Sequence, residues 1–337
     1  MDANWNVQMN MNRMTETHAM RGSDVGSGVA AAAAADGSAQ VSAASASAAE
    51  ASRKPGVGKT ILGVFMAFVI MIGSSILASL PASGLVAAGV PAALCNAVYG
   101  LAYLGIAVLL VRLVFGKALR LKVSELGMPK FSIRGRYVLL GILLPAVITG
   151  IFLLFVSGAF VRPETGIAES TANLSYGIFY CSIAAAFVEE IIFRGVIMHL
   201  LKKRCPTALA VLLPSLLFGL IHLTEVESLN LSDAALLVVA GTLAGTMFSV
   251  VALKSGSVWN SGIVHAIWNL IMVGGGLSIA PAVNEMSLVT YVTKNTSTLL
   301  TGGAFGVEAS IIAIAGYLAV ILLLCGCGKI KGKKNLG

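Results

Sequence analysis

The sequence predicts an all-α polytopic membrane protein, folded as a bundle of about eight transmembrane helices. Of its 337 residues, 57% are hydrophobic and only 11% are charged, whereas soluble domains carry about 25% charged residues. The mean hydropathy of +0.89 agrees with this class. From residue 60 onward, mostly apolar runs of roughly 17–25 residues alternate with short polar loops, and such runs have the length of a transmembrane helix.

Each predicted span is a mostly apolar run that ends at a polar or basic loop. We expect helices rather than strands, because open sheet edges leave backbone groups unsatisfied in lipid. The eight runs cover residues 60–80, 94–115, 137–160, 174–201, 207–223, 234–253, 258–279 and 306–326.

Two terminal segments fall outside the predicted bundle, to which we assign residues 58–328. Residues 28–52 are mostly Ala, Ser and Gly, and they include no aromatic residue, Leu, Ile or Met. Such a composition cannot bury enough apolar surface to offset the entropy of ordering. We therefore expect residues 1–57 to form a disordered cytoplasmic tail and residues 329–337 to form a short basic cytoplasmic tail.

Basic residues occupy alternate loops, and this asymmetry predicts the orientation in the membrane. The opposite loops are acidic and carry only Arg162 and Lys294 as basic residues. We therefore expect both termini on the cytoplasmic side. The same pattern accounts for the net charge of +8 and argues against a nucleic-acid partner, since no basic face with interleaved aromatic residues appears. The basic loops and flanks contain Arg53, Lys54, Lys59, Lys117, Arg120, Lys122, Lys130, Arg134, Arg136, Lys202, Lys203, Arg204, Lys254, Lys329, Lys331, Lys333 and Lys334.

Three ionisable residues stand close together inside the fourth predicted span: Glu189, Glu190 and Arg194. A charge at the centre of a bilayer costs about 2.5–3.5 kcal/mol, so such residues are candidates for function. Glu190 and Arg194 share one helical face and can neutralise each other, a pairing that is equally consistent with a structural role. Glu189 points elsewhere and has no obvious local partner, which makes it a candidate general base.

Two other spans also carry polar groups on one helical face. Phe218 and His222 lie four residues apart in the fifth span, and His265 and Asn269 do so in the seventh. Taken singly, a histidine or asparagine in a span more often forms a hydrogen bond to a neighbouring helix than takes part in catalysis. A single phenylalanine in a span is more often a packing residue. Together with the two glutamates, however, these groups are tolerated only where they face inward and meet, or line a wet cavity.

The chemistry that this set could perform is the activation of water. Glu189, helped by His222, could deprotonate water for attack on a peptide carbonyl. His265 and Asn269 could donate hydrogen bonds to the developing oxyanion. The set Glu189, His222 and His265 would equally suit a catalytic Zn²⁺ ion with water as the fourth ligand. The sequence leaves both possibilities open: a bound Zn²⁺, or no cofactor.

If these residues meet at one site, they should lie at similar depths in the membrane, but their expected depths differ. Counted from the basic loops at about 1.5 Å per residue, Glu189 lies about 20 Å deep and His222 about 27 Å deep. On the same scale His265 lies about 12 Å deep and Asn269 about 18 Å deep. Tilted helices, or breaks at residues such as Pro214, would have to align them.

The three patterns resemble a known signature. Glu189-Glu190-xxx-Arg194-Gly195, Phe218-xxx-His222 and His265-xxx-Asn269 occur in this order, each on a predicted span. They resemble the three motifs of the CPBP intramembrane proteases, which include the CAAX prenyl proteases and bacterial relatives linked to bacteriocin processing, self-immunity and abortive infection. The motif core covers about residues 174–280, and the eight-span layout is also similar to that of the family.

The resemblance implies an intramembrane endopeptidase with a role for each motif residue. Glu189 would be the catalytic base, and Glu190 would orient the site together with Arg194. His222 would assist water activation, and His265 with Asn269 would bind the oxyanion. The family has been described both as metalloproteases and as enzymes in which a glutamate activates water.

The expected partners are membrane lipid and a peptide or lipidated-protein substrate, cleaved near the cytoplasmic side of a bacterial cell membrane. No oligomeric state follows from the sequence. Two other functions use the same residues. Buried Glu and His side chains form proton relays in proton- or ion-coupled transporters, although no self-similar halves appear here. A non-catalytic bacteriocin-immunity membrane protein would keep the site without using it.

Overall fold

The computed structural model describes residues 56–226, 230–295 and 297–326. The predicted basic tail, residues 329–337, and residues 1–55 of the predicted N-terminal tail lie outside these ranges. Val57, the last residue of that predicted tail, is the first residue of helix α3.

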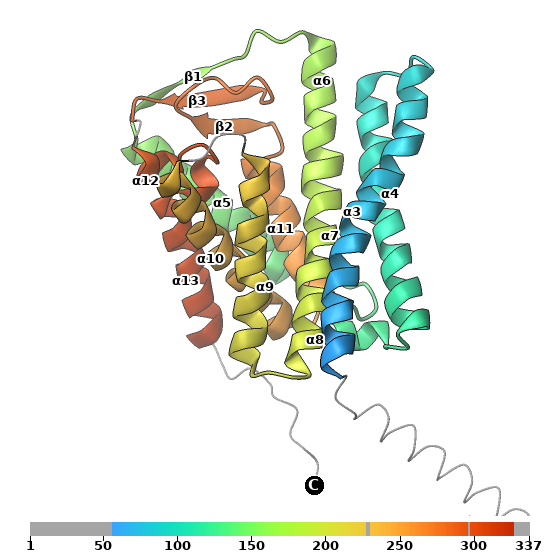
Figure 1. Cartoon of the computed structure of the whole chain (residues 1–337). Coiled ribbons are helices and arrows are strands. Elements are labelled where there is room, and N and C mark those ends of the chain that lie inside the picture. The colour runs from blue at the N-terminus through green and yellow to red at the C-terminus, as the bar shows by residue number, and fades with distance from the viewer. Residues whose placement is uncertain (1–55, 227–229, 296, 327–337) are drawn as a thin grey trace, which may run out of the picture. The chain divides into compact units, whose positions relative to one another are not determined.

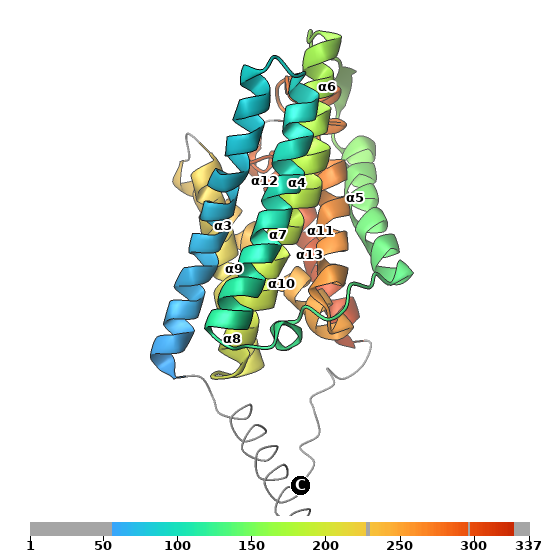
Figure 2. The same ribbon diagram turned by 90° about the vertical axis from the view of Figure 1, so that its right-hand side faces the viewer.

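The described residues from 56 onward form helices that lie side by side, with a small sheet at one end (Figures 1 and 2). Five described helical stretches are long and apolar enough to cross a membrane: Val57–Ala87, Ala92–Ala118, Gly135–Phe155, Thr207–Glu225 and Leu231–Ser255. The predicted class, an all-α integral membrane protein, is confirmed, whereas the predicted number of eight spans is not. The separate helices are α3 (Val57–Ala87), α4 (Ala92–Val111) continued by η1 (Arg112–Ala118), α5 (Gly135–Phe155), α9 (Thr207–Ile221) continued by η5 (His222–Glu225), α10 (Leu231–Ser255), α11 (Val258–Met272), α12 (Thr298–Thr301) and α13 (Ile311–Gly326), with short 3₁₀ turns η2 (Val123–Leu126) and η6 (Val307–Ala309).

The fourth predicted span lies within one uninterrupted helical rod from Ile167 to Lys202. Two parts of this rod are π-helical, and such segments are frequent at functional sites. Glu189 ends an α-helical turn and Glu190 begins the second π-helical segment, so the two glutamates lie at a junction in the rod. Its consecutive parts are α6 (Ile167–Ser175), η3 (Tyr176–Ala185), α7 (Ala186–Glu189), η4 (Glu190–Ile197) and α8 (Met198–Lys202).

Two hydrophobic clusters hold the rod and the neighbouring helices together. The first joins the rod to α3 and α4 and includes Ile70, Tyr103 and Phe193. The second joins α5, α10, α11 and α13 and includes Phe248 and Trp268 among its members. The outward face of α3 is apolar as well and exposes large side chains, as expected of a face that contacts lipid; these include Ile61, Phe65, Ile72 and Ile76.

Three short strands form a sheet with the order β1-β3-β2. In this sheet β1 (Gly158–Val161) pairs antiparallel with β3 (Val289–Thr293), and β2 (Leu277–Ala280) pairs parallel with it. Figure 1 shows the sheet beyond the ends of α9 and α11, at the end of the bundle where α6 begins. β2 is the strand nearest to the helices.

Two predicted spans were therefore too long. The span 137–160 ends as a helix at Phe155, and the span 258–279 ends as a helix at Met272. Residues 158–160 and 277–279 are strand instead, contrary to the expectation that these spans hold only helix. Hydropathy could not separate the two, because the strands are as apolar as the helices that they follow. Each strand follows the end of its helix after a short connection.

Candidate active site

Glu190 and Arg194 form an ion pair inside the bundle. Arg194 Nη1 donates to Glu190 Oε1 at 2.8 Å, and their side chains are 1% and 0% exposed, respectively. The predicted pairing is confirmed. Burial leaves each ion dependent on the other, because removing one partner would leave an uncompensated charge away from water.

Aromatic rings surround the guanidinium group of Arg194. Its Cζ lies 4.4 Å from the centroid of the Phe218 ring and 5.5 Å from that of Phe248. These distances are within the range of cation–π attraction. Phe218, which the sequence suggested as a packing residue, therefore also contacts the cation, and it links α9 to the rod.

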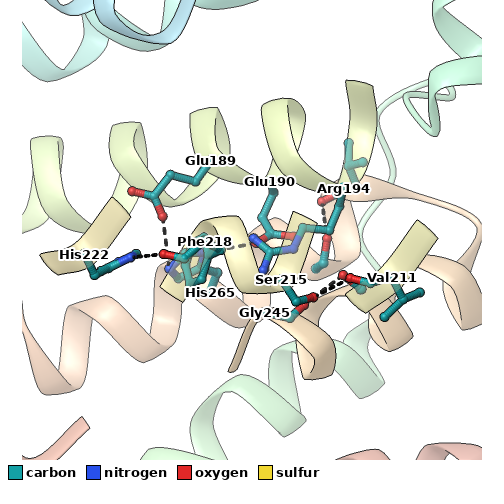
Figure 3. A network of polar contacts seen from close by, with 12 residues as sticks. Glu189, Glu190, Arg194, Val211, Ser215, Phe218, His222, Gly245 and His265 are labelled. Atoms are coloured by element: carbon teal, nitrogen blue, oxygen red, sulfur yellow. Dashed lines mark hydrogen bonds and ion pairs between the residues drawn. The ribbon is translucent and has the colours of Figure 1, made fainter. Parts of the chain in front are cut away.

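His265 lies between the two glutamates. Its Nδ1 is 3.2 Å from Glu190 Oε1, its Nε2 is 3.8 Å from Glu189 Oε2, and its ring stacks on Phe248 at 4.3 Å. Glu189 has no obvious partner on its own helix, since neighbouring residues on a helix diverge by about 100°, and we expected polar groups of other spans to supply one. His265 on α11 is such a group, because its imidazole ring lies between the two glutamate side chains and reaches both of them (Figure 3).

The contact with Glu190 fixes the tautomer of His265. An ionised carboxylate only accepts hydrogen bonds, and Glu190 is paired with Arg194, so the Nδ1–H of His265 donates to Glu190. In the neutral ring Nε2 then carries no proton and is directed at Glu189. Donation from Nε2 to an oxyanion would therefore require the doubly protonated ring.

His222 is oriented by its own helix. It follows the last residue of α9, and its Nδ1 donates to the carbonyl oxygen of Phe218 at 2.7 Å. Its ring also packs on Phe218, with the centroids 4.5 Å apart. Donation from Nδ1 leaves the lone pair of Nε2 available, as a general base or a metal ligand requires.

Asn269 connects α11 to the rod. Its Nδ2 donates to the carbonyl oxygen of Cys181 at 2.9 Å, in the π-helical segment η3. One amide hydrogen is used in this bond, and the second remains for another acceptor. Asn269 thus has the interhelical contact that a single asparagine in a span predicts, and it lines the same cavity as the histidines.

A cavity of about 380 Å³ brings four of the predicted residues together: Glu189, His222, His265 and Asn269. Glu190 and Arg194 lie beside it as a buried support. The four residues line one cavity although their expected depths in the spans differ. The helix break at Pro214 that could have aligned them is not present, because α9 continues through Pro214 to Ile221. The remaining lining is largely aromatic or apolar and includes Tyr176, Tyr180, Phe218, Phe248, Trp268, Phe305 and Tyr317.

Two acidic residues of the cavity were missed in the sequence. Glu308 accepts a hydrogen bond from Trp268 Nε1 at 2.7 Å, and its carbonyl oxygen accepts one from the hydroxyl group of Tyr317. Glu225 also lines the cavity. Glu308 could have been found, because it lies in the predicted span 306–326 and a charge within a span marks a candidate site. Glu225 is exposed and is the last residue of η5; in the sequence it lies just after a predicted span, and no signal distinguishes it from the acidic residues of the loops.

The cavity lies toward the end of the bundle that is opposite the basic loops. Part of its lining comes from η5, which continues α9, and from η6, which precedes α13. In Figure 1 these ends of α9 and α13 lie near the sheet, whereas α8 ends the rod at the opposite end of the bundle. The predicted orientation, with the basic loops in the cytoplasm, would put this end of the bundle on the outer side. Cleavage near the cytoplasmic side and this orientation therefore do not agree with each other, and both stay predictions.

The predicted zinc ligands do not form a metal site as they are arranged. Among the residues that the structure describes, no group of three His, Cys, Asp or Glu side chains is placed to hold a metal ion. His265 donates from Nδ1 to Glu190, and this leaves its Nε2, 3.8 Å from a carboxylate oxygen of Glu189, free for a metal. The misfit is that, among the described residues, no third His, Cys, Asp or Glu side chain is placed with this pair.

Comparison with known proteins agrees with the motifs. Residues 171–271 match the family model described as type II CAAX prenyl endopeptidase Rce1-like. The matched segment contains all six predicted site residues, from Glu189 to Asn269. No curated protein and no solved structure matches the chain. The resemblance to the CPBP proteases is thereby confirmed: residues 171–271 match an Rce1-like type II CAAX prenyl endopeptidase domain, which is consistent with the CPBP family.

Proposed function

We propose that this protein is an intramembrane endopeptidase in which Glu189, assisted by His222, activates water to hydrolyse a peptide bond. One observation carries the proposal: Glu189, His222, His265 and Asn269, which come from three separate parts of the sequence, line one cavity. A bundle tolerates such groups only where they meet or contact water, and the family match supports peptide hydrolysis as their use.

Glu189 is the proposed general base. Its side chain is 20% exposed to the cavity, whereas that of Glu190 is 0% exposed and tied to Arg194. Glu189 would remove a proton from water, and the resulting hydroxide would attack the peptide carbonyl carbon. The same carboxyl group would then return the proton to the departing amine, so that water is consumed and two chain ends are released.

The other residues of the site have supporting roles. The free Nε2 of His222 would accept a hydrogen bond from the attacking water and orient it. Glu190 and Arg194 would hold His265, and Asn269 would use its second amide hydrogen for the oxyanion. A donor role for His265 would require Glu189 to pass the proton that it receives to Nε2 while the oxyanion exists, and to take it back before it protonates the departing amine.

The proposal is tested by replacing Glu189 with Gln in the full-length protein, reconstituted in lipid nanodiscs. Internally quenched peptides of random sequence serve as substrates. Glu189→Gln keeps the size of the side chain but removes its basicity, and we expect a fall in kcat of at least about 100-fold, the lower range of general-base catalysis. Glu169→Gln, which changes an exposed carboxylate of α6, is the matched control. Turnover by Glu189→Gln equal to that of the control would refute the proposed role.

We also propose that the basic loops face the cytoplasm of a bacterial cell, which places the cavity on the outer side of its membrane. This orientation rests on the alternation of basic and acidic loops. A membrane-impermeant maleimide applied to whole cells should label a cysteine introduced at Glu285 but not one introduced at Lys130, both in a background in which the five native cysteines are replaced by Ser. Labelling of the Lys130 site alone would reverse the orientation.

A further inference from the structure

A second cavity, of about 530 Å³, adjoins the first. It lies between β2, the loop that follows β2, and the segment Gly303–Glu308. The two cavities share the lining residues Val273, Phe305 and Glu308. A chain that reaches the proposed catalytic residues from this end of the bundle could therefore continue directly into the second cavity.

One wall of the second cavity is the free edge of a β-strand. All four residues of β2 line it, and among the described strands β2 is at the edge of the sheet, next to β3. In a parallel pair, the backbone groups of alternate residues point toward the partner strand. Gly275 accepts a hydrogen bond from Leu288 on the β3 side, so the alternation directs the backbone groups of Ser278 and Ala280 toward the free edge.

Charged side chains give the combined cavities a single sign. Glu189, Glu225 and Glu308 line the first cavity, and Glu285 and Glu308 line the second. No lysine or arginine lines either of them in the part of the chain that the structure describes. Glu308 is held in place by Trp268 and Tyr317 rather than by a cation. Carboxyl groups without a lysine or arginine beside them favour a cationic occupant, because a nearby cation stabilises their ionised form.

We propose that the second cavity is the subsite for the substrate segment next to the scissile bond, and that its occupant is an extended peptide with a Lys or Arg side chain. The peptide adds as a strand to the free edge of β2, a recognised mode of peptide binding. Its backbone pairs with Ser278 and Ala280, and its basic side chain reaches Glu308, where the two cavities meet. This inference rests on the proposed endopeptidase function and specifies the substrate.

The charge preference is tested with three pools of internally quenched decapeptides. The pools are random except for one central position, which is fixed as Lys, Gln or Glu. We expect the wild-type protein in nanodiscs to cleave the Lys pool about tenfold faster than the Glu pool, since hydrogen bonds to charged groups contribute about 1.5–3 kcal/mol. Glu308→Gln keeps an oxygen for Trp268 and should remove most of this difference. Glu164→Gln, an exposed carboxylate outside both cavities, should leave it unchanged.

Strand addition is tested at Ser278. Proline is tolerated in an edge strand where its missing N–H faces away from the ladder, so Ser278→Pro removes one donor from the free edge. Ser278→Ala loses the hydroxyl group that accepts from Asn284 but keeps the N–H. We expect kcat/KM to fall about fivefold in Ser278→Pro relative to Ser278→Ala, as one lost hydrogen bond of about 1 kcal/mol predicts.

The outcomes separate the subsite from the catalytic proposal. Equal cleavage of the three pools by the wild-type protein, or equal kcat/KM for Ser278→Pro and Ser278→Ala, would overturn the subsite and leave the endopeptidase in place. If no pool is cleaved, the catalytic proposal fails. Retention of the pools by the Glu189→Gln protein, read by mass spectrometry, then decides the subsite. Preferential retention of Lys peptides supports it, and equal retention of Lys and Glu peptides overturns it.

Discussion

Replacing Arg194 with methionine should destabilise the protein far more than any replacement of a surface cation. Arg194 is 1% exposed and is paired at 2.8 Å with Glu190, which is 0% exposed. Removing one member of a buried pair costs about 3–5 kcal/mol, because the remaining charge stays away from water. A loss of this size changes the unfolding equilibrium constant by a factor of about 100 to several thousand, at about 1.4 kcal/mol per tenfold change.

Lys203→Met is the matched control. Lys203 pairs with Glu125 at 2.9 Å, a distance almost equal to that of the buried pair, but the two side chains are 28% and 36% exposed. Exposed pairs of this kind contribute about 0–1 kcal/mol. The measurement is reversible unfolding by denaturant in detergent micelles, followed by the fluorescence of Trp259 and Trp268. Equal free energies of unfolding for Arg194→Met and Lys203→Met would refute the argument from burial.

A double variant separates stability from catalysis. Replacing a whole buried pair by neutral side chains of similar volume is often close to neutral for stability, so Glu190→Gln combined with Arg194→Met should regain most of the free energy lost in Arg194→Met. Peptide cleavage should not return, because His265 then lacks the ionised partner that fixes its tautomer. Cleavage at the wild-type rate by the double variant would show that the pair only supports the fold.

Three further predictions concern packing, water activation and metal. Gly100→Ala should lower the melting temperature, because a Cβ at Gly100 would overlap the carbonyl group of Phe179 on the rod; Gly105→Ala in the same helix meets no atom within 4 Å and should raise it slightly through helix propensity. His222→Ala should reduce kcat about 100-fold or more if Nε2 orients the attacking water, whereas unchanged kcat would remove His222 from the mechanism. Treatment with 1,10-phenanthroline should leave the cleavage rate within about twofold of the untreated rate, since the donor arrangement does not fit a metal; a loss of activity that added Zn²⁺ restores would contradict this reading of the site.

Two pairs of residues show which parts of the site could be predicted from the sequence. Motif spacing placed Glu190 and Arg194 on one helical face, and their ion pair is present, because a local relation within one helix depends only on helical geometry. Depth counting from the loops suggested a poor match between His222 and His265, yet both line one cavity. Depth along a helix does not fix how neighbouring helices tilt and cross, and these quantities depend on side-chain packing.

The sequence by itself determined the membrane class, the three motifs and the family, because composition and spacing are properties of the chain. It did not determine the sheet, which continues the apolar runs of two predicted spans, or the positions of Glu225 and Glu308 in the cavity. Only the tertiary structure decided that His265 lies between both glutamates and that the cavity faces the end opposite the basic loops. These features depend on contacts between segments that are distant in sequence, and hydropathy and helical periodicity describe each segment separately.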